Sequence, residues 1–333
     1  MRIFRRIALQ IVVSACFMAL LLWRVNPRRM RADLASANPR WLALAVPVFL
    51  LSEVLHGLRW WLLARRTGPI PVHEGVLARM LAGGIDLILP LHAGYAALAQ
   101  FVNRRYGIDR ATALGTLAAE GVTVVVAGGV LVLAAAPFLL RDAGLPARPL
   151  LLLGAGLLVC ALLVLAVYLV VGREQLVRVV PERLRTAIPA LFQSFRAGFA
   201  GLGSPASVAV VLLATVAEWV AAAAAFAVVG RGFGIHVAPW WYLAAEIVSY
   251  ASFAVPLTQG NLGPFEVALE ETLRRGGARR SRSAAFAIGA HAVLVIATVL
   301  GAVLAAALLR LRRSDLFYLR APSSPDEDTA RTG

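Results

Sequence analysis

The stretch Pro256-Leu257-Thr258-Gln259-Gly260-Asn261-Leu262-Gly263-Pro264-Phe265-Glu266 decides the fold of this chain. It follows an apolar run, residues 240–255, that has the composition of a membrane span, yet it holds two prolines, two glycines and four polar side chains. Backbone that leaves the helical conformation inside hydrocarbon must bond to protein or line a wet cavity. The stretch therefore predicts a broken helix that carries polar groups at membrane depth, as in the midplane binding sites of many transporters.

Each part of the stretch has a physical reason. Pro256 stops the preceding helix, while Gly260 and Gly263 permit sharp turns and close approach. Glu266 lies near the start of a new short helix, where the positive helix terminus favours a carboxylate. Together they predict a substrate-binding site made of Thr258, Gln259, Gly260, Asn261, Gly263 and Glu266.

A second copy of the pattern lies earlier in the chain. Pro90-Leu91-His92-Ala93-Gly94 repeats the Pro-Leu-x-x-Gly spacing of residues 256–260, and an arginine pair and a glycine follow each copy before a long apolar run. Two readings are open, an internal repeat or two unrelated breaks between helices. If the pattern is a repeat, we expect the two breaks to meet inside the membrane and to line one polar cleft. Glu120 and His291, each from the span after its break, would add a polar group.

Composition makes the chain an integral membrane protein. Of its 333 residues 60% are hydrophobic, and the mean hydropathy is +0.76. All 33 basic residues are arginine, which excludes Walker-type phosphate loops and Schiff-base chemistry on a lysine. The arginines behind the net charge of +15 flank apolar runs, which favours membrane orientation and lipid partners over nucleic acid. Cys16 and Cys160 lie inside apolar runs, so no disulfide framework is expected.

The apolar runs predict an all-α polytopic membrane protein with about seven to eight transmembrane helices and two re-entrant broken-helix segments. The seven runs are residues 7–23, 41–63, 111–139, 149–171, 207–229, 240–255 and 283–309. Residues 76–101 are interrupted by glycines and a proline, and we expect them to form two half-length helices in a re-entrant hairpin. The membrane domain then covers residues 1–312, with an amphipathic connector at 172–204 in the headgroup plane, and a disordered polar tail follows at 313–333.

The arginine distribution predicts a cytoplasmic N-terminus. With seven full spans, the basic loop at residues 274–282 lies on the same side as the N-terminus. If residues 258–275 cross as well, the last two segments reverse and the C-terminus becomes cytoplasmic. Both topologies are open from the sequence.

Ionisable side chains within the spans are the remaining candidates. One such group at the bilayer centre costs roughly 2.5–3.5 kcal/mol, so it usually faces a cavity or a partner. The groups either form structural ion pairs or line a polar path for a lipid headgroup, and Arg59 could also snorkel to the interface from its helix end. Beside the stretch 258–266, the expected substrate-binding residues are Arg59, His92, Arg104 and Glu120. The other expected intramembrane polar positions are Glu53, His56, Asp86, Glu218, Glu246 and His291.

The sequence contains no metal-ligand spacing, no nucleophile elbow and no evident nucleophile–base pair. We therefore expect no metal site, no cofactor and no enzymatic activity.

The chain resembles the flippase-like family of the transmembrane region of lysylphosphatidylglycerol synthase, which includes stand-alone members. Across residues 5–312 the family features are matched at Arg59-Trp60, Leu89, Pro90, Gly94 and Glu120, and most specifically at Pro256, Thr258, Gly260, Gly263 and Glu266. The chain departs from the family pattern at His92, Tyr95, Gly121, Gln259 and Asn261.

The resemblance implies a protein of the inner or plasma membrane that binds or translocates a lipid, either a phospholipid or a polyprenyl-linked lipid. The synthase domain of some relatives is absent from this sequence, so aminoacyl transfer to lipid is not expected. The alternative is a non-transporting partner that scaffolds a glycosyltransferase or another lipid-modifying enzyme. Because His92, Tyr95 and Gly121 replace charged family residues, either the lipid differs or transport is lost.

Overall fold

The computed structural model describes residues 2–89, 92–143, 193–194, 196–254 and 258–311, with isolated residues 152, 154–156 and 159 between them. Across these residues every regular element is a helix, which confirms the all-α fold. Most of the expected span at 149–171 and most of the expected connector at 172–204 lie outside the described residues, and so does the tail at 313–333.

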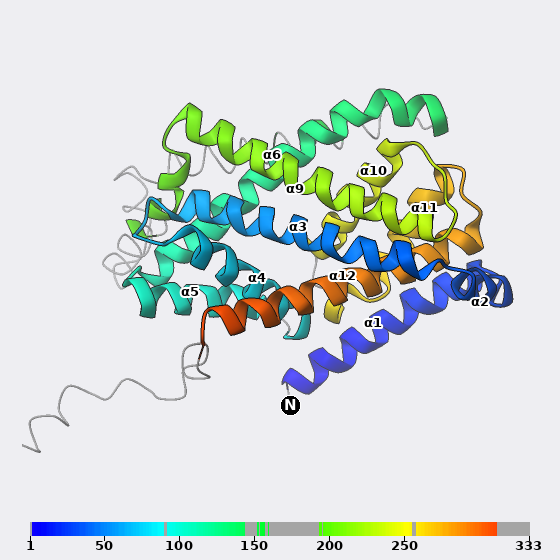
Figure 1. The fold of residues 1–333 in the computed structure, drawn as a ribbon, viewed down its shortest axis with the longest axis horizontal. Coiled ribbons are helices and arrows are strands. Elements are labelled where there is room, and N and C mark those ends of the chain that lie inside the picture. Colours follow the sequence, from blue (N-terminus) through cyan, green and yellow to red (C-terminus); the bar gives the residue numbers. More distant parts are fainter. Residues whose placement is uncertain are drawn as a thin grey trace, which may run out of the picture.

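Within the described residues, four helices are long and apolar enough to cross a membrane: α3 (Pro39–Ala64), α6 (Arg110–Ala143), α9 (Pro205–Gly232) and α12 (Arg280–Leu308). They extend broadly along the long axis of the molecule (Figure 1). A fifth span arises if α1 (Arg2–Arg24) and α2 (Pro27–Ala35), which meet at a bend of 94°, count as one. The described residues thus hold four to five of the expected seven to eight spans.

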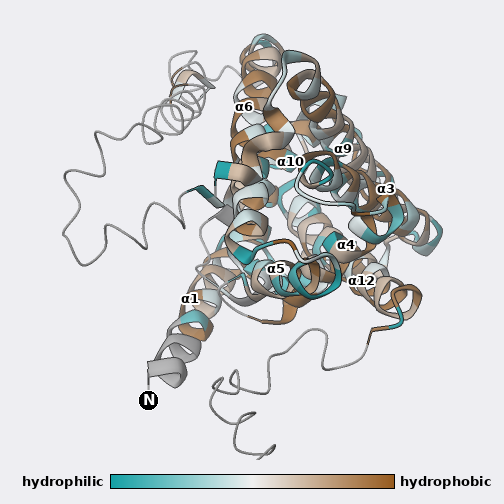
Figure 2. Ribbon diagram, turned by 90° about the vertical axis from the view of Figure 1, so that its left-hand side faces the viewer, coloured by the Kyte–Doolittle hydropathy of each residue, from teal (hydrophilic) through white to brown (hydrophobic). Residues whose placement is uncertain are grey.

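The outside of the bundle is apolar. In the view turned by 90°, much of the ribbon of α6, α9 and α12 is coloured as hydrophobic (Figure 2). Large apolar side chains on α9 and α12, such as Leu213, Val303 and Leu304, are more than half exposed. A water-soluble monomer rarely exposes so much continuous apolar surface, so this surface suits contact with lipid.

Three of the helices begin at the same sequence signal, a small polar residue followed by proline. The side chain of Asn26 accepts hydrogen bonds from the first turn of α2, Asn38 does so for α3, and Ser204 does so for α9. Such caps pair backbone N–H groups that the helix leaves free, and proline suits the first helical position because it has no N–H to pair.

The bundle has two ends, which we name after one residue each. At the Asn38 end, the Asn38 N–H donates to the Gly232 carbonyl at 2.9 Å, and Arg282 Nη1 donates to the Gly234 carbonyl at 3.1 Å. This end therefore holds the start of α3, the end of α9 and the start of α12. The opposite, Ile70 end is marked by a buried cluster that includes Ala64, Ile70, Ile108 and Leu309.

The first helical hairpin consists of α4 (Val72–Ile88) and α5 (Ala93–Tyr106). Glu74, at the start of α4, lies 2.5 Å from Nε of Arg105 and accepts a hydrogen bond from Tyr106, both at the end of α5. The hairpin thus opens at the Ile70 end, and α4 and α5 agree with the two half-length helices expected in 76–101.

The second helical hairpin consists of α10 (Pro239–Ala254), the short 3-10 turn η4 (Gln259–Asn261) and α11 (Pro264–Arg275). Gly276, after α11, lies so close to Trp241 in α10 that a Cβ on it would come within 2.8 Å of the indole. The hairpin therefore opens at the Asn38 end. The prediction of a full span at 240–255 is wrong: α10 has 16 residues, short of the roughly 20 that a crossing needs, and the chain returns to the end it left.

This return also places the loop at residues 274–282. Arg279 and Arg282 lie 3.9 and 3.7 Å from Asp33 in α2, so the loop sits where α1 ends, not where α1 begins. The side of the membrane on which the loop lies stays a prediction. Helix α12 consequently ends at the Ile70 end, as in the alternative in which the last segments reverse.

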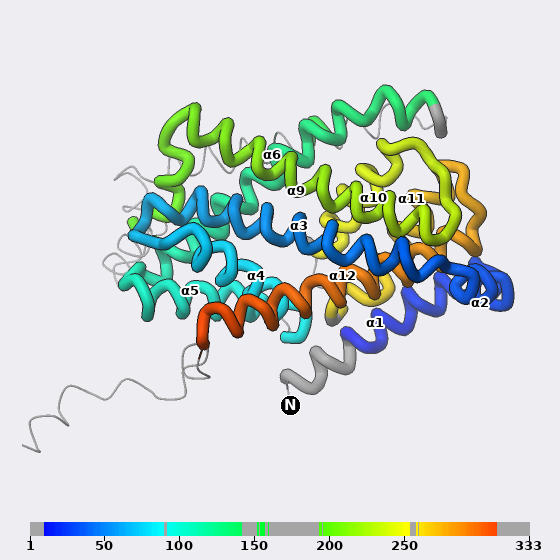
Figure 3. Tube along the Cα trace, in the orientation of Figure 1, coloured from blue at the N-terminus to red at the C-terminus, as the bar shows by residue number. Residues whose placement is uncertain are grey.

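The tips of the two hairpins meet in the middle of the molecule. Gly260 in η4 faces Leu87 near the end of α4, whose carbonyl oxygen lies 3.8 Å from the position of a Cβ on Gly260. Figure 3 traces how α4–α5 enters from one end of the bundle and α10–α11 from the other. The order helix, hairpin, helix occurs twice, as α3, α4–α5, α6 and as α9, α10–α11, α12.

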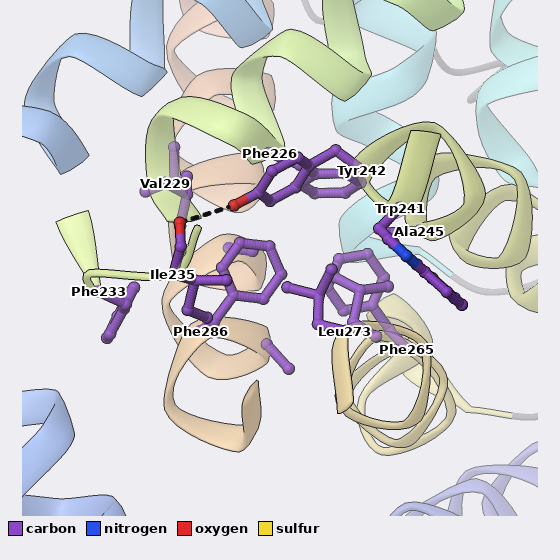
Figure 4. Close-up of a cluster of buried hydrophobic side chains, with 14 of the residues drawn as sticks. Phe226, Val229, Phe233, Ile235, Trp241, Tyr242, Ala245, Phe265, Leu273 and Phe286 are labelled. Carbon is purple, nitrogen blue, oxygen red and sulfur yellow. Dashed lines mark hydrogen bonds between the residues drawn. The ribbon is translucent and has the colours of Figure 1, made fainter. Parts of the chain in front are cut away.

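Aromatic packing fixes the second hairpin between α9 and α12 (Figure 4). Phe226 of α9 lies 6.3 Å from the ring of Phe265 in α11 and 6.1 Å from that of Phe286 in α12, and all three side chains are fully buried. Tyr242 of α10 packs on Phe286, and its hydroxyl donates to the Ile235 carbonyl at 3.1 Å. These contacts make the hairpin part of the largest buried core cluster.

Candidate functional site

A cavity of about 320 Å³ lies where the two hairpin tips meet; we call it the central cavity. Both breaks reach its wall, the first through His92 and the second through Thr258, Gly260 and Asn261. Side chains of α1, α3, α4, α5, α9, α10 and α12 also contribute to the wall. The two breaks therefore border the same cavity, but Glu120 and His291, which were expected to add polar groups to it, are not part of its wall.

A buried ion-pair network lies against the central cavity. Arg59 of α3, fully buried, places Nη2 3.1 Å from Oε1 of Glu120 and Nη1 2.5 Å from Oε2 of Glu218. One guanidinium therefore joins α3 to α6 and α9. Arg59 does not snorkel to the interface, because its charge is met by carboxylates inside the bundle.

His56 and Arg79 extend the network to the first hairpin. His56, one turn before Arg59, lies 3.1 Å from Oε1 of Glu120 and 3.3 Å from Oε1 of Glu218. Arg79 of α4 lies 3.4 Å from Oε2 of Glu120, so four helices share the network. A buried network of this kind is strongly destabilised when one partner is removed, because a charge is left unpaired in a low-dielectric interior.

Three carboxylates of the cavity wall lie apart from this network: Glu53, Asp86 and Glu246. Glu53 accepts a hydrogen bond from Thr298 at 3.0 Å, Asp86 accepts one from the Gly94 N–H at 2.6 Å, and Oε2 of Glu246 lies 3.5 Å from Oγ of Ser249. Within the described part of the chain, no arginine or histidine nitrogen lies within 4 Å of these carboxylates. The wall of the cavity therefore carries more carboxylates than guanidinium groups.

The tips themselves add polar groups and unusual backbone. His92 and Asn261 have φ of 53° and 58°, a left-handed conformation that is uncommon outside glycine. The Asn261 side chain donates to Oγ of Ser252 at 2.5 Å. Thr258 is buried, and its hydroxyl has no hydrogen-bond partner in the described structure. Strained backbone and an unpaired hydroxyl beside a cavity are features of functional sites.

Glu266 and His291 form a separate buried pair. Oε1 of Glu266 lies 2.5 Å from Nδ1 of His291, and Oε2 accepts the Gly263 N–H at 2.6 Å. This carboxylate closes a capping box at the start of α11, which is how the chain resumes a helix after the break. Neither Glu266 nor Gly263 belongs to the wall of the central cavity, so the structure assigns them to support of the break.

The structure brings most of the predicted residues together, with clear exceptions. Arg104 lies exposed in the last turn of α5 near the Ile70 end, away from the central cavity. Arg79 is the arginine that reaches the cavity from this hairpin, and its guanidinium also lies 5.4 Å from the ring centre of Tyr95. Sequence reasoning omitted Arg79 from the binding residues, although it lies in the same interrupted apolar segment as Asp86. Another omission is Tyr250, which lines the cavity from α10.

No group of three or more His, Cys, Asp or Glu side chains among the described residues is arranged to hold a metal ion. The wall of the central cavity combines charged and hydrogen-bonding side chains with apolar ones such as Phe49, Leu87 and Phe253.

One protein family matches this chain by its family model. The match covers residues 7–314, nearly the whole chain, and the family is described as the lysylphosphatidylglycerol synthase TM region. No curated protein matches the sequence.

Proposed function

Because the chain belongs to the lysylphosphatidylglycerol synthase transmembrane-region family, we propose that it binds a membrane lipid and moves the lipid headgroup across the bilayer through the central cavity. The proposed lipid is a phospholipid or a polyprenyl-linked lipid of the cell membrane, and no enzymatic step is involved.

The observation that carries the proposal is the cavity between the two hairpin tips. Broken backbone at membrane depth must be paired by protein or must face water, and here both breaks border the same cavity, whose wall carries several charged side chains. Transporters place substrate sites at such breaks because free helix ends and side chains there can replace the hydration of a polar group. A lipid headgroup at this position would be held midway between the two ends of the bundle.

We infer that both hairpins are re-entrant and that the two helix–hairpin–helix units form an inverted repeat. Hairpin α4–α5 opens at the Ile70 end and hairpin α10–α11 opens at the Asn38 end. In inverted-repeat transporters, one unit moves against the other around a fixed site and exposes it to each side in turn. Tips that touch at Leu87 and Gly260 would separate the two exits.

The wall chemistry favours a headgroup that offers hydrogen-bond donors. Glu53, Asp86 and Glu246 present carboxylates without a cationic partner within 4 Å in the described structure. A carboxylate at membrane depth is costly unless water, a donor or a cation faces it. Hydroxyl or amine groups of a lipid headgroup would donate hydrogen bonds to these carboxylates while the lipid passes.

A vesicle assay tests the proposal. Purified protein is reconstituted into liposomes that hold a fluorescent lipid, and a quencher added outside reports how fast the inner leaflet becomes accessible. We expect wild type to exceed protein-free vesicles for at least one phospholipid or polyprenyl-linked lipid. Glu246→Gln should slow this rate about tenfold or more, as expected when a charge-assisted hydrogen bond to substrate is lost. Glu271→Gln, which removes a carboxylate outside the central cavity, is the matched control.

The same assay addresses the alternative function, a non-transporting partner of a glycosyltransferase or lipid-modifying enzyme. Wild-type rates equal to those of empty vesicles, for every lipid class, would favour that alternative. Transport by wild type that Glu246→Gln leaves unchanged would rule out a route along this wall of the cavity.

A further inference from the structure

A second cavity, of about 530 Å³, lies at the Asn38 end, apart from the central cavity. Its wall comes from the bend between α1 and α2 and from the start of α12. We call it the basic pocket, and the polar residues in its wall include Arg24, Arg29, Asp33, Arg279, Arg280 and Ser281.

The basic pocket has an excess of positive charge. Among the described residues, Asp33 is the one acidic residue in its wall, and Arg279 at 3.9 Å shares that carboxylate with Arg282 at 3.7 Å. Arg280 lies 3.3 Å from Oε1 of the buried Glu270. Arg24 and Arg29 have no carboxylate within 4 Å in the described part of the chain. Two guanidinium groups therefore remain available to a ligand.

The start of α12 adds to the preference for an anion. Arg279 precedes this 29-residue helix and makes no side-chain cap, so the first-turn N–H groups have no partner from the cap residue. Arg280 and Ser281, both in that first turn, line the pocket. A helix start favours negative charge through its free N–H groups and its dipole, and here it acts together with the guanidinium groups.

Aromatic residues mark this end as the level of the lipid headgroups. Trp23, directly before Arg24, is 83% exposed, and Trp240 and Trp241 begin α10 at the same end. The guanidinium carbon of Arg231 lies 5.5 Å from the ring centre of Trp41. Tryptophan is enriched where hydrocarbon meets the headgroup region. Helix α2, which leaves α1 at 94°, then lies across the end of the bundle.

We propose that the basic pocket binds the phosphate group of an anionic membrane lipid. Guanidinium groups match phosphate oxygens with paired, charge-assisted hydrogen bonds, and several arginines around one cavity can bond several oxygens of the same phosphate. A lipid held there joins α1 and α2 to α12. This site is separate from the route proposed for transport. The proposal that it binds a lipid therefore does not depend on whether the chain transports lipid.

The test titrates the full-length protein in detergent with short-chain phosphatidylglycerol and follows the midpoint of thermal unfolding. Parallel titrations use short-chain phosphatidylcholine and inorganic phosphate. We expect phosphatidylglycerol to raise the midpoint and the two other compounds to have little effect. The double variant Arg24→Gln and Arg29→Gln should weaken the apparent affinity for phosphatidylglycerol about tenfold or more, because it removes two charge-assisted contacts.

The matched control is the double variant Arg28→Gln and Arg31→Gln, which makes the same charge change on α2 outside the pocket wall. Equal losses in the two double variants would overturn the proposal, since they would indicate only general surface charge. No stabilisation of wild type by phosphatidylglycerol would overturn it as well. Stabilisation by inorganic phosphate at similar concentrations would overturn the assignment to lipid. Both variant pairs are exposed, and unfolding without added lipid checks that they fold; Arg29→Gln alone serves if the double variant does not fold.

Discussion

The two helical hairpins, α4–α5 and α10–α11, are stabilised by different kinds of interaction. Each turns the chain inside the bundle and has buried apolar contacts, but the first also joins the ion-pair network of Arg59, whereas the second packs into a cluster of aromatic rings. Arg79 of α4 joins the ion pairs of Glu120, and Asp86 bonds the start of α5. Phe265 of α11 is buried against Phe226, and Glu266 caps the start of the same helix. Similar helix breaks in a sequence can therefore be stabilised by different interactions. Substitutions that remove charge or side-chain volume should destabilise the two hairpins to different extents.

The largest effect is expected at the centre of the ion-pair network. Arg59→Ala leaves the carboxylates of Glu120 and Glu218 buried without their shared guanidinium, which should cost about 3–5 kcal/mol of unfolding free energy. Denaturant unfolding of the purified protein in mixed micelles measures this loss. The control is Arg65→Ala, an exposed arginine at the end of the same helix. A loss of less than about 1 kcal/mol for Arg59→Ala would contradict a structural role for the network.

The two glycines of the repeated pattern should respond differently. A Cβ on Gly94 would overlap the Ala82 carbonyl of α4, so Gly94→Ala must push the helices of the first hairpin apart at about 1–3 kcal/mol. Gly260 has free space around it but a φ of 58°, so Gly260→Ala should cost only about 1 kcal/mol. Unfolding midpoints of the two variants, measured side by side, give the order. The reverse order would mean that close helix packing does not constrain the first hairpin.

The aromatic core should make the second hairpin sensitive to volume. Phe265→Leu removes part of a fully buried ring between α9 and α11, and we expect a loss of about 1–1.5 kcal/mol that does not depend on salt concentration. Phe138→Leu, at a half-exposed ring on α6, is the control and should change the unfolding free energy little. A strong salt dependence for Phe265→Leu would remove the proposed contrast with the charged hairpin.

The smallest effect concerns pH at the open end of the first hairpin. A hydrogen bond from Arg105 holds the pKa of Glu74 below its usual value of 4.5, and burial raises the pKa of Tyr106 beside it to about 12. Because the folded-state pKa of Glu74 is the lower one, its stabilisation is complete above pH 4.5. It is lost as the pH falls through the folded-state value. Since Arg105 is about half exposed, the contribution should stay below about 1 kcal/mol.

Comparison of Glu74→Gln with Glu271→Gln checks this point. Glu271 has its pKa lowered mainly by Arg274, but it pairs with arginines of its own helix and not across a hairpin. Unfolding midpoints between pH 3 and 7 should lose acid sensitivity more in Glu74→Gln. Identical pH profiles for both variants and wild type would show that the pair across α4 and α5 contributes nothing.

The sequence allowed the first hairpin to be predicted but not the second. Two glycines, an aspartate and a proline interrupt the apolar residues 76–101, and such breakers signal short helices. Residues 240–255 have no interruption, and only their length of 16 residues, too short for a crossing, hinted at a return. The side of the membrane expected for the loop at residues 274–282 depended on treating residues 240–255 as a full span.

The residues of the candidate site were also predicted only in part from the sequence. The cost of burying charge pointed to Arg59, Glu120, Glu218 and Glu246, and the structure places all four at or beside the central cavity. Arg104 was chosen for its position after the repeated pattern, whereas Arg79 is the arginine buried in the cavity wall. Which face of a helix meets the cavity depends on how α4 and α5 pack on α3 and α6, and spacing along one helix does not reveal that.

The most direct test of the central claim links the two hairpin tips. Leu87→Cys and Thr258→Cys place a thiol on each side of the central cavity, in a background where Cys16 and Cys160 are replaced by serine. A short bifunctional thiol reagent with a reducible link then joins the tips in the vesicle assay. If lipid passes between the tips, transport should stop on linking and return after reduction, while each single-cysteine protein stays active. Undiminished transport with the tips fully linked would contradict a lipid route through the central cavity.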